Sequence, residues 1–413
     1  MEGDQREQVM NGSIVVPTPP SWARDLFTVG VTGTNGKSTT TTWIAAALAA
    51  SGAPVVRATT LGFFVDDEEL SLERTYDGFL ECMRIGHARG ARFATIELTS
   101  EALARGFAKA WPCRVGVFTN LTHDHLDAHG SPEHYLASKA QLFVSLEPGG
   151  VAVLNARDEA SALIAEVLPQ GVRCVTYGVP SRGEACLDED VSVTTVALDW
   201  SGTRVECMVH GNPVGLSVRA IGEVHAENAL AAWLGAEAAG IPRDEALARI
   251  ARAPAPPGRF EVVSTAPHVV VDYAHTPDAL ARTLATARAL ASRVEGARLF
   301  VVFGAGGKRD REKREPMGRS ACVADVVILT SDNPRDEDPK DIAAAIAKGL
   351  VGHGDVRTVL DRGHAIRAAI SEASDEDVVV LAGMGHEREQ HVGNRRIAFS
   401  DVDVAKEAVA ARF

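Results

Sequence analysis

A glycine-rich turn followed by Lys-Ser is the part of this 413-residue chain whose residue types and spacing point most directly to chemistry. Residues 30–40 read G-V-T-G-T-N-G-K-S-T-T, between an apolar run over 26–31 that predicts a strand and an Ala-rich run over 41–50 that predicts a helix. Backbone N–H groups at such a junction bind phosphate oxygens, Lys37 adds a positive charge, and the Ser38 hydroxyl is a ligand for Mg²⁺. The first glycine of the general phosphate-loop pattern is absent, and a plain glycine turn is the alternative. Lys-Ser before a helix favours nucleotide binding.

A second cluster of polar side chains follows an expected strand over 114–119. Residues 118–130 read F-T-N-L-T-H-D-H-L-D-A-H-G, with three histidines and two aspartates in one loop. Ligands of parallel sheets bind at the carboxyl ends of the strands, where this loop would lie. A surface loop with satisfied histidines is the alternative for any one of them, but their crowding beside a phosphate-binding turn favours a site.

The next segment predicts a helix with a lysine on its apolar face. Ser131 is a good N-cap and Pro132 suits the first helical position. Tyr135, Lys139 and Phe143 are spaced i, i+4, i+8 and therefore share one face. A buried free ammonium is costly. A lysine that extends to solvent is the alternative, and the spacing alone does not decide between them.

Polar clusters also follow other expected strands. Glu97 lies at the end of the expected strand 93–98, where a carboxylate suits Mg²⁺. In the C-terminal half, such clusters occupy 271–277, 303–314, 330–335 and 383–387. Arginines among them suit carboxylate or phosphate groups, although most of the charges in 308–314 read as a solvated run.

The order of the elements places these clusters in two successive α/β segments of the chain. Apolar strand candidates (93–98, 114–119, 151–154, 173–176) alternate with helix candidates (40–50, 79–89, 132–146, 225–239), which predicts a parallel sheet flanked by helices. Residues 190–220 alternate apolar and polar residues, as in an antiparallel meander. The segment 253–258, A-P-A-P-P-G, reads as a stiff linker. After it the α/β alternation restarts, with strands expected over 268–272, 299–303, 326–330 and 377–381 and helices over 277–290, 316–323 and 339–349.

Composition narrows the class of protein. The net charge of −13 argues against broad binding to nucleic acid or to an anionic membrane. The six cysteines contain no C-x-x-C pair, which argues against a zinc or disulfide framework. Because no apolar run reaches the length of a membrane span or a signal core, we expect a cytoplasmic protein.

Seven motifs together resemble the Mur ligase family, and within it the MurE branch. They are T-G-T-N-G-K-S-T at 32–39, T-N-L-T-H-D-H-L-D-A-H-G at 119–130, H-Y-L-A-S-K-A-Q-L-F at 134–143, P-G-R-F-E at 257–261, D-Y-A-H-T-P at 272–277, D-N-P-R at 332–335 and G-H-E at 385–387. The polar, Pro-containing composition of the first residues predicts a flexible lead-in over 1–27. The resemblance implies a P-loop ATPase-like central domain over 28–256 and a Rossmann-like amino-acid-binding domain over 257–413. That branch serves peptidoglycan (cell-wall) synthesis.

The resemblance implies an ATP- and Mg²⁺-dependent ligase that activates an acceptor carboxylate as an acyl phosphate and joins it to an amino acid. Implied ATP contacts are Gly33, Thr34, Asn35, Gly36, Lys37, Ser38, Thr39, Asn228, Arg259, Asp272 and His275. Implied metal ligands are Ser38, Glu97, His125 and Lys139, the last as a carbamylated lysine. Lys37, Lys139 and His125 form the implied catalytic set.

The incoming amino acid is assigned by the same resemblance. Arg335 matches the arginine that holds the distal carboxylate of a diamino acid, and Arg314 matches a second carboxylate-binding arginine. Asp332, Asn333, Gly383 and Glu387 belong to the same implied pocket. The implied amine is meso-diaminopimelate.

Several positions depart from the family pattern on the acceptor side. The phosphate-binding turn begins near residue 30, which leaves no room before it for the UDP-binding N-terminal domain of the MurE branch. Glu101, Val224-His225, Lys308 and Met384 also replace the residues usual in that branch. We expect an acceptor that lacks UDP, one that is held differently, or one bound with the help of a partner protein.

Two further interpretations remain open at this point. One is a MurE-like ligase that acts on a UDP-free acceptor in a specialised pathway. The other is a non-catalytic nucleotide-binding subunit, which the presence of Lys37, Glu97, His125 and Lys139 disfavours.

Overall fold

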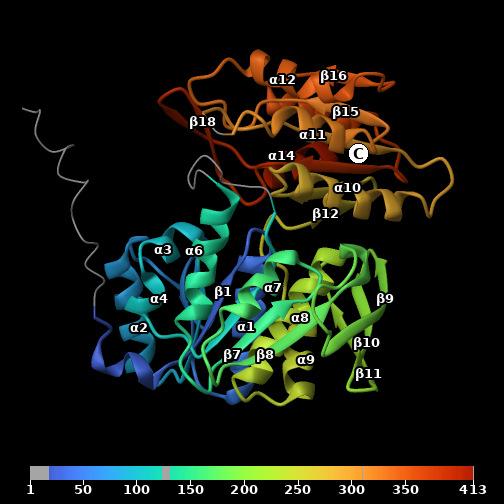
Figure 1. Cartoon of the computed structure of the whole chain (residues 1–413). Coiled ribbons are helices and arrows are strands. Elements are labelled where there is room, and N and C mark those ends of the chain that lie inside the picture. Colours follow the sequence, from blue (N-terminus) through green and yellow to red (C-terminus); the bar gives the residue numbers. More distant parts are fainter. Residues whose placement is uncertain (1–17, 123–130, 309, 413) are drawn as a thin grey trace, which may run out of the picture. The chain divides into compact units, whose positions relative to one another are not determined.

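A computed structural model of the chain describes residues 18–122, 131–308 and 310–412 (Figure 1). Its packing forms two compact units, residues 18–121, 131–192 and 228–250 in the first and residues 193–227 and 251–412 in the second. The last change of unit lies just before the Pro-rich segment 253–258. Because residues 193–227 group with the second unit, the domain boundaries expected from the sequence stay a prediction.

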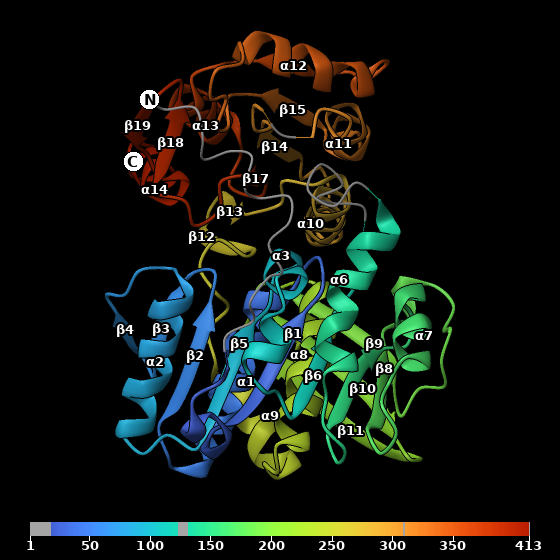
Figure 2. The same cartoon turned by 60° about the vertical axis from the view of Figure 1, so that its left-hand side comes forward.

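The first sheet has eleven strands in the order β11-β10-β9-β8-β7-β6-β1-β5-β2-β3-β4. Strands β2, β5, β1, β6, β7 and β8 run parallel to one another, and β2, β5, β1 and β6 lie side by side in Figure 2. The strands are β1 Phe27–Thr32, β2 Val55–Thr59, β3 Gly62–Val65, β4 Glu68–Leu70, β5 Phe93–Glu97, β6 Val115–Phe118, β7 Val151–Asn155, β8 Arg173–Gly178, β9 Val191–Asp199, β10 Gly202–Val209 and β11 Asn212–Val218. The β10–β11 pair is antiparallel, which confirms a meander within 190–220.

The helices of this part of the chain are α1 Lys37–Leu48, α2 Tyr76–Ala88, α3 Ser100–Ala104, α4 Phe107–Ala110, α6 Pro132–Val144, α7 Glu159–Glu166, α8 Glu223–Ala238 and α9 Arg243–Arg252, with short 3₁₀ turns η2 Ser21–Asp25, η3 Ala49–Ser51 and η4 Pro180–Arg182. Trp111, Phe118 and Phe143 are fully buried in the apolar core that joins the sheet to these helices. Helix α1 begins at Lys37, earlier than the expected 40 or 41, because Gly36 adopts φ +82° and caps the helix there. Lys37 and Ser38 therefore lie in the first helical turn.

The second sheet has six strands in the order β12-β13-β17-β14-β15-β16. Its strands are β12 Glu261–Thr265, β13 His268–Asp272, β14 Leu299–Phe303, β15 Val326–Leu329, β16 Val356–Thr358 and β17 Val378–Ala382. All neighbours are parallel except β12 and β13. A two-stranded hairpin, β18 Glu389–Val392 and β19 Arg395–Ala398, stands apart from this sheet.

Helices cover both faces of the second sheet. They are α10 Pro277–Ala291, α11 Arg314–Ala321, α12 Pro339–Ala347, α13 Arg362–Glu372 and α14 Asp401–Ala410, with η5 Lys348–Leu350. Along β14, Val301 and Phe303 pack with α10, α11 and α12, whereas Phe300 and Val302 pack with α13 and α14. This alternation explains why the strands read as continuous apolar runs. The predicted α/β class, with a second, Rossmann-like sheet flanked by helices, is confirmed.

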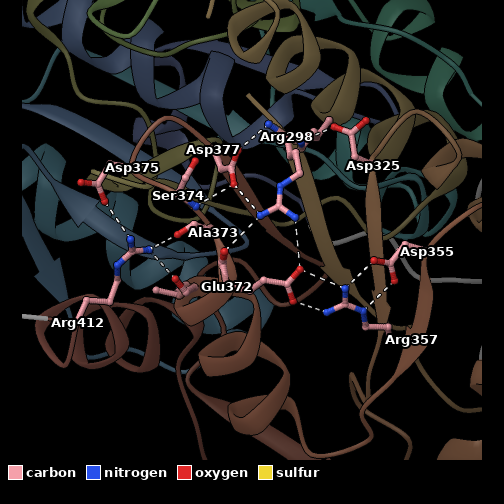
Figure 3. Close-up of polar contacts among 12 residues, drawn as sticks. Arg298, Asp325, Asp355, Arg357, Glu372, Ala373, Ser374, Asp375, Asp377 and Arg412 are labelled. Atoms are coloured by element: carbon pink, nitrogen blue, oxygen red, sulfur yellow. Dashed lines mark hydrogen bonds and ion pairs between the residues drawn. The ribbon is translucent and has the colours of Figure 1, made fainter. Parts of the chain in front are cut away.

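A network of arginines and carboxylates closes the amino-terminal ends of the second sheet (Figure 3). Arg298, Asp325, Asp355 and Asp377 each directly precede a parallel strand. Arg298 donates to Asp377 at 3.2 Å and to Glu372 at 3.4 Å, and Arg357 binds both Glu372 and Asp355. The charged side chains at the amino-terminal ends of these strands therefore pair with one another within the unit.

Within the described residues, no helix is both long and apolar enough to cross a bilayer.

Candidate active site

The phosphate-binding turn after β1 is held by the segment after β6. The N–H of Thr34 donates to the carbonyl of Asn120 at 2.7 Å, and the N–H of Asn35 donates to the Asn120 side chain at 2.9 Å. In return, the Thr119 hydroxyl and the Asn120 amide donate to the carbonyl of Asn35 at 2.6 and 3.1 Å. The two segments close over each other at the carboxyl ends of neighbouring parallel strands, where a ligand of this sheet would bind.

Two glycines of the turn are required by close approach as well as by backbone conformation. A Cβ at Gly33 would lie 2.0 Å from the Thr119 hydroxyl oxygen, and a Cβ at Gly36 would lie 2.2 Å from the Asn228 side-chain oxygen. Both glycines also have positive φ angles, +149° and +82°. The structure therefore places Asn228 directly against the turn, while its expected contact with adenine stays a prediction.

Ser38 and Glu97, two of the expected metal ligands, are in contact. The Ser38 hydroxyl donates to Oε2 of Glu97 at 2.8 Å, and the N–H and hydroxyl of Thr60 donate to the same oxygen at 3.1 Å each. A hydroxyl beside a carboxylate at a helix N-terminus gives the oxygen donors that Mg²⁺ prefers, so these residues fit that metal. The Lys37 ammonium lies over the same turn and donates to the carbonyl of Thr34 at 2.7 Å.

Lys139 is buried, which decides between the two alternatives left open by the sequence. It is 1% exposed, and Tyr135 and Phe143 are buried on the same helix. Its Nζ donates to the carbonyl of Gly33 at 2.6 Å and lies 4.3 Å from the centre of the Tyr135 ring. The Tyr135 hydroxyl lies 3.2 Å from the Thr34 hydroxyl. Helix α6 therefore brings Lys139 to the phosphate-binding turn, whereas His125 lies outside the described residues.

In the second unit, the carboxylate of Asp272 organises the end of β13. It accepts hydrogen bonds from the N–H groups of Phe260 and Ala274 and from the Thr283 hydroxyl, at 2.7, 2.8 and 3.1 Å. Burial raises the pKa of Asp272, although the nearby Arg259 and these hydrogen bonds act in the opposite direction.

Arg259 and His275 both lie against Tyr273. The guanidinium of Arg259 is 4.8 Å from the centre of the Tyr273 ring, and the ring of His275 is 4.6 Å from it. The structure thus brings three of the expected ATP contacts, Arg259, Asp272 and His275, together at the carboxyl end of β13.

Residues of the expected amino-acid pocket lie near one another where β15 and β17 end. The Asn333 amide donates to Glu387 at 2.7 Å, and a Cβ at Gly383 would lie 2.5 Å from Oδ2 of Asp332. Burial raises the pKa of Glu387, the negative charge of Asp332 raises it further, and the Asn333 hydrogen bond lowers it in part. Four of the expected residues are therefore neighbours, and their carboxylates make this a site suited to a cation.

Arg335 is held in an unusual backbone conformation beside this pocket. Its φ is +52°, a region that a residue with a Cβ seldom adopts. The N–H of Arg335 donates to the carbonyl of His391 at 3.0 Å, and its guanidinium donates to the carbonyl of Gly307 at 2.6 Å. Within the described residues it forms no ion pair, so its fork is available for a carboxylate.

Arg314 has a carboxylate partner within the protein. Its side chain is 5% exposed and forms two hydrogen bonds with Glu337, at 3.1 and 3.2 Å. These bonds, together with the N–H of Lys308, lower the pKa of Glu337 to about 2. Arg314 thus lies at the expected edge, but its expected binding of a substrate carboxylate stays a prediction.

Three residues of the site were not predicted from the sequence. Asn120 forms hydrogen bonds with the phosphate-binding turn, Thr60 with Glu97, and Glu337 with Arg314. Asn120 lies in the loop motif that the sequence did identify, where the histidines and aspartates drew attention. Glu337 lies two residues after Arg335, and charge complementarity with the basic segment 308–314 is the signal that identifies it. No pattern along the chain indicates that Thr60 meets Glu97.

Known families and proteins resemble this chain over most of its length. The Mur ligase middle domain matches residues 31–236, and the Mur ligase, glutamate ligase domain matches residues 258–385. A UDP-N-acetylmuramoyl-L-alanyl-D-glutamate--2,6-diaminopimelate ligase from Geobacillus thermodenitrificans is 36% identical over 408 residues, which cover 94% of this chain and 79% of that protein. A protein of the same name from Ralstonia nicotianae is 38% identical, with 96% of this chain and 78% of that protein covered.

Solved structures agree with these sequence matches. A UDP-N-acetylmuramoyl-L-alanyl-D-glutamate--2,6-diaminopimelate ligase has a TM-score of 0.66 and 32% identity, covering 94% of this chain and 79% of that one. A folylpolyglutamate synthase from Mycobacterium tuberculosis, at 20% identity and a TM-score of 0.70, covers 94% of this chain and 91% of its own length and shares the fold. The chain therefore belongs to the Mur ligase family of ATP-dependent ligases that form peptide bonds.

Proposed function

We propose that this protein joins the carboxylate of an acceptor to the amino group of a diamino acid of the diaminopimelate type, with hydrolysis of ATP. The observation that carries the proposal is the contact of Ser38 with Glu97 at the N-terminus of a helix that follows a glycine turn. This combination supplies backbone donors for phosphate and oxygen ligands for Mg²⁺. Bound Mg²⁺ would reduce the repulsion between the triphosphate and the acceptor carboxylate.

The roles of the chain's own residues follow from where they lie. Lys37, folded over the turn, would bind the terminal phosphate, so that the acceptor carboxylate can take the γ-phosphoryl group. The amine would then displace phosphate from that acyl phosphate and form the amide. Arg259, Asp272 and His275 are proposed to contact ATP.

Lys139 is proposed to act as a carbamate. Its position against the carbonyl of Gly33 places it next to the turn, and addition of CO₂ to the neutral amine would replace a buried cation with an anion. Such an anion suits a site that binds Mg²⁺.

Selection of the amine is assigned to Arg335 and the Asn333–Glu387 pair. A distal carboxylate fits the guanidinium of Arg335, and a distal ammonium fits the half-buried carboxylate of Glu387. A hydrogen bond to a charged group contributes about 1.5–3 kcal/mol. Diaminopimelate differs from lysine by this distal carboxylate, so the two amines form a matched pair.

The names of the relatives suggest UDP-N-acetylmuramoyl-L-alanyl-D-glutamate as the acceptor. The altered Glu101 and His225 leave a UDP-free acceptor as the alternative. Both acceptors should be tested in the same assay.

Phosphate release from ATP tests the proposal when it is measured with Mg²⁺, each acceptor, and either meso-diaminopimelate or lysine. We expect release to require acceptor and amine together, with kcat/KM for diaminopimelate at least about tenfold above that for lysine. Lys37→Ala should abolish release. If no pair of acceptor and amine stimulates the wild-type protein while it binds ATP, the protein is a nucleotide-binding subunit and the proposed reaction is wrong.

Lys139→Ala tests the carbamate separately. We expect the variant to lose turnover and short carboxylates such as formate to restore part of it. Full activity without any added carboxylate would contradict the role of the carbamate.

A further inference from the structure

One buried arginine reaches both loops that form the expected amino-acid pocket. The side chains of Arg362 and Asp401 are 0% exposed, and two hydrogen bonds of 2.6 and 2.7 Å join them. The same guanidinium donates to the carbonyl of Ala382 at 3.0 Å and to the carbonyl of Ser331 at 3.4 Å. Ala382 ends β17 and Ser331 follows β15, so Arg362 links the loops that begin at these two points.

A glutamine on the β18–β19 hairpin also binds the loop that follows β15. The side-chain amide of Gln390 donates to the carbonyl of Asp332 at 2.5 Å and to that of Ser331 at 3.4 Å. The next residue, His391, donates its N–H to the Asn333 side chain at 2.8 Å and accepts from the N–H of Arg335.

These contacts determine how closely the two loops approach each other. The loops pack so closely that a Cβ at Gly383 would lie only 2.5 Å from Oδ2 of Asp332. The Asn333–Glu387 hydrogen bond of 2.7 Å spans the loops. A shift of one loop past the other would break that bond and move Arg335.

We propose that Arg362 and Gln390 are positioning residues that fix the Asp332–Arg335 loop against the Gly383–Glu387 loop. The proposal rests on the proposed function, since it takes these loops as the amino-acid site. Neither side chain is assigned a contact with substrate. Their effect on the reaction passes through Asn333, Arg335 and Glu387, because a misplacement of about 1 Å at a binding group can lower a rate by about 100-fold.

The test uses Gln390→Met, which removes the amide donors of a half-buried side chain, and Arg362→Lys, which keeps the charge but not the fork. The matched control is Arg298→Lys, at the other end of the same sheet, where the arginine pairs with the carboxylates of Glu372 and Asp377. We expect the first two variants to raise the KM for the amine by about tenfold or more while the KM for ATP stays within about twofold. Arg298→Lys should leave both values unchanged.

Hydrogen–deuterium exchange of the same proteins gives a measurement that does not depend on turnover. We expect faster exchange in peptides covering 331–335 and 383–387 for Gln390→Met and Arg362→Lys, with peptides of β14 unchanged. If exchange at the two loops matches wild type in Gln390→Met, the positioning role is wrong, whether or not the protein is a ligase.

The two proposals fail in different ways. Wild-type protein without amine-dependent turnover, but with loop exchange that quickens in the variants, would overturn the proposed function and leave the link between the loops standing. Active variants with quickened exchange and an unchanged KM for the amine would overturn the positioning role, because the residues would then serve stability alone.

Discussion

The two ends of the six-stranded sheet use the same residue types in opposite ways. At the amino-terminal ends of the strands, arginines pair with the carboxylates of Asp355, Glu372 and Asp377 (Figure 3). Hydrogen bonds from Arg357 lower the pKa of Glu372 and Asp355. At Asp377, burial acts to raise the pKa, but hydrogen bonds from the N–H groups of Arg298 and Ser374 outweigh it.

At the carboxyl ends, the carboxylates of buried Asp272 and half-buried Glu387 are only partly compensated. Burial raises the pKa values of Asp272 and Glu387, and the guanidinium of Arg335 donates to a backbone carbonyl within the described residues. The comparison teaches that the amino-terminal ends pair their charges internally. The carboxyl ends also contain paired charges, Arg314–Glu337 and Arg362–Asp401, but there Glu387 and Arg335 keep charge and donors for a ligand. The predictions below test that contrast, from the largest effect to the smallest.

Among variants at the two ends of this sheet, Arg335→Ala should produce the largest effect on the reaction. Loss of two charge-assisted hydrogen bonds of about 1.5–3 kcal/mol each predicts a fall of more than 100-fold in kcat/KM for the diamino acid. Steady-state rates at varied amine concentration measure it, with lysine as the control amine. If diaminopimelate and lysine lose activity equally, Arg335 does not bind the distal carboxylate.

Glu337→Gln should lower stability, because it leaves the buried guanidinium of Arg314 without its anion. We expect a loss of about 2 kcal/mol at neutral pH, measured by urea unfolding. The folded pKa of Glu337 is lowered from 4.5 to about 2, so this stabilisation is present above pH 4.5 and disappears as the pH falls through about 2. A difference between variant and wild type that stayed constant over that range would contradict the role of the ionised pair.

Glu387 should give amine binding a pH dependence. The raised pKa means that Glu387 takes up a proton at a higher pH than an ordinary glutamate, and the protonated form cannot pair with an ammonium. We therefore expect the KM for the amine to rise by about tenfold as the pH falls through that raised pKa. In Glu387→Gln the KM should be high at every pH, and a profile identical to wild type would rule out Glu387 as the titrating group.

Arg357→Met, at the paired edge, should have the smallest effect. Its two carboxylate partners are both more than a third exposed, and exposed pairs contribute about 0–1 kcal/mol each. We expect a small loss of stability and no change in the KM for either substrate. A change in amine KM would show that the two edges are coupled and would weaken the contrast.

The sequence predicted the parts of the fold that depend on local pattern. The alternation of strands and helices and the meander within 190–220 follow from spacing. Spacing also placed Lys139 on one helical face with Tyr135 and Phe143, but it did not decide whether the lysine is buried, which the structure shows. The phosphate-binding turn could be identified because its glycines, lysine and serine are contiguous. The start of α1 was placed too late because the left-handed Gly36 sets the helix boundary.

The remaining features depend on contacts between residues far apart in the chain. Arg362 and Asp401 are separated by 39 residues, and the Thr60–Glu97 contact spans 37. Glu97 was identified by its place at a strand end, but nothing in the pattern of Thr60, Arg362 or Asp401 points to its partner, so only the fold shows these contacts. Arg335 was assigned from a motif, but its left-handed backbone and its contact with Gly307 could not be read from that motif.

The most direct test of the reaction follows one oxygen atom. With the acceptor carboxylate labelled with ¹⁸O, ATP, Mg²⁺ and the diamino acid, the account predicts that each amide formed releases one phosphate carrying one ¹⁸O from the acceptor. Amide formation with no label in the phosphate would contradict activation of the carboxylate by phosphorylation.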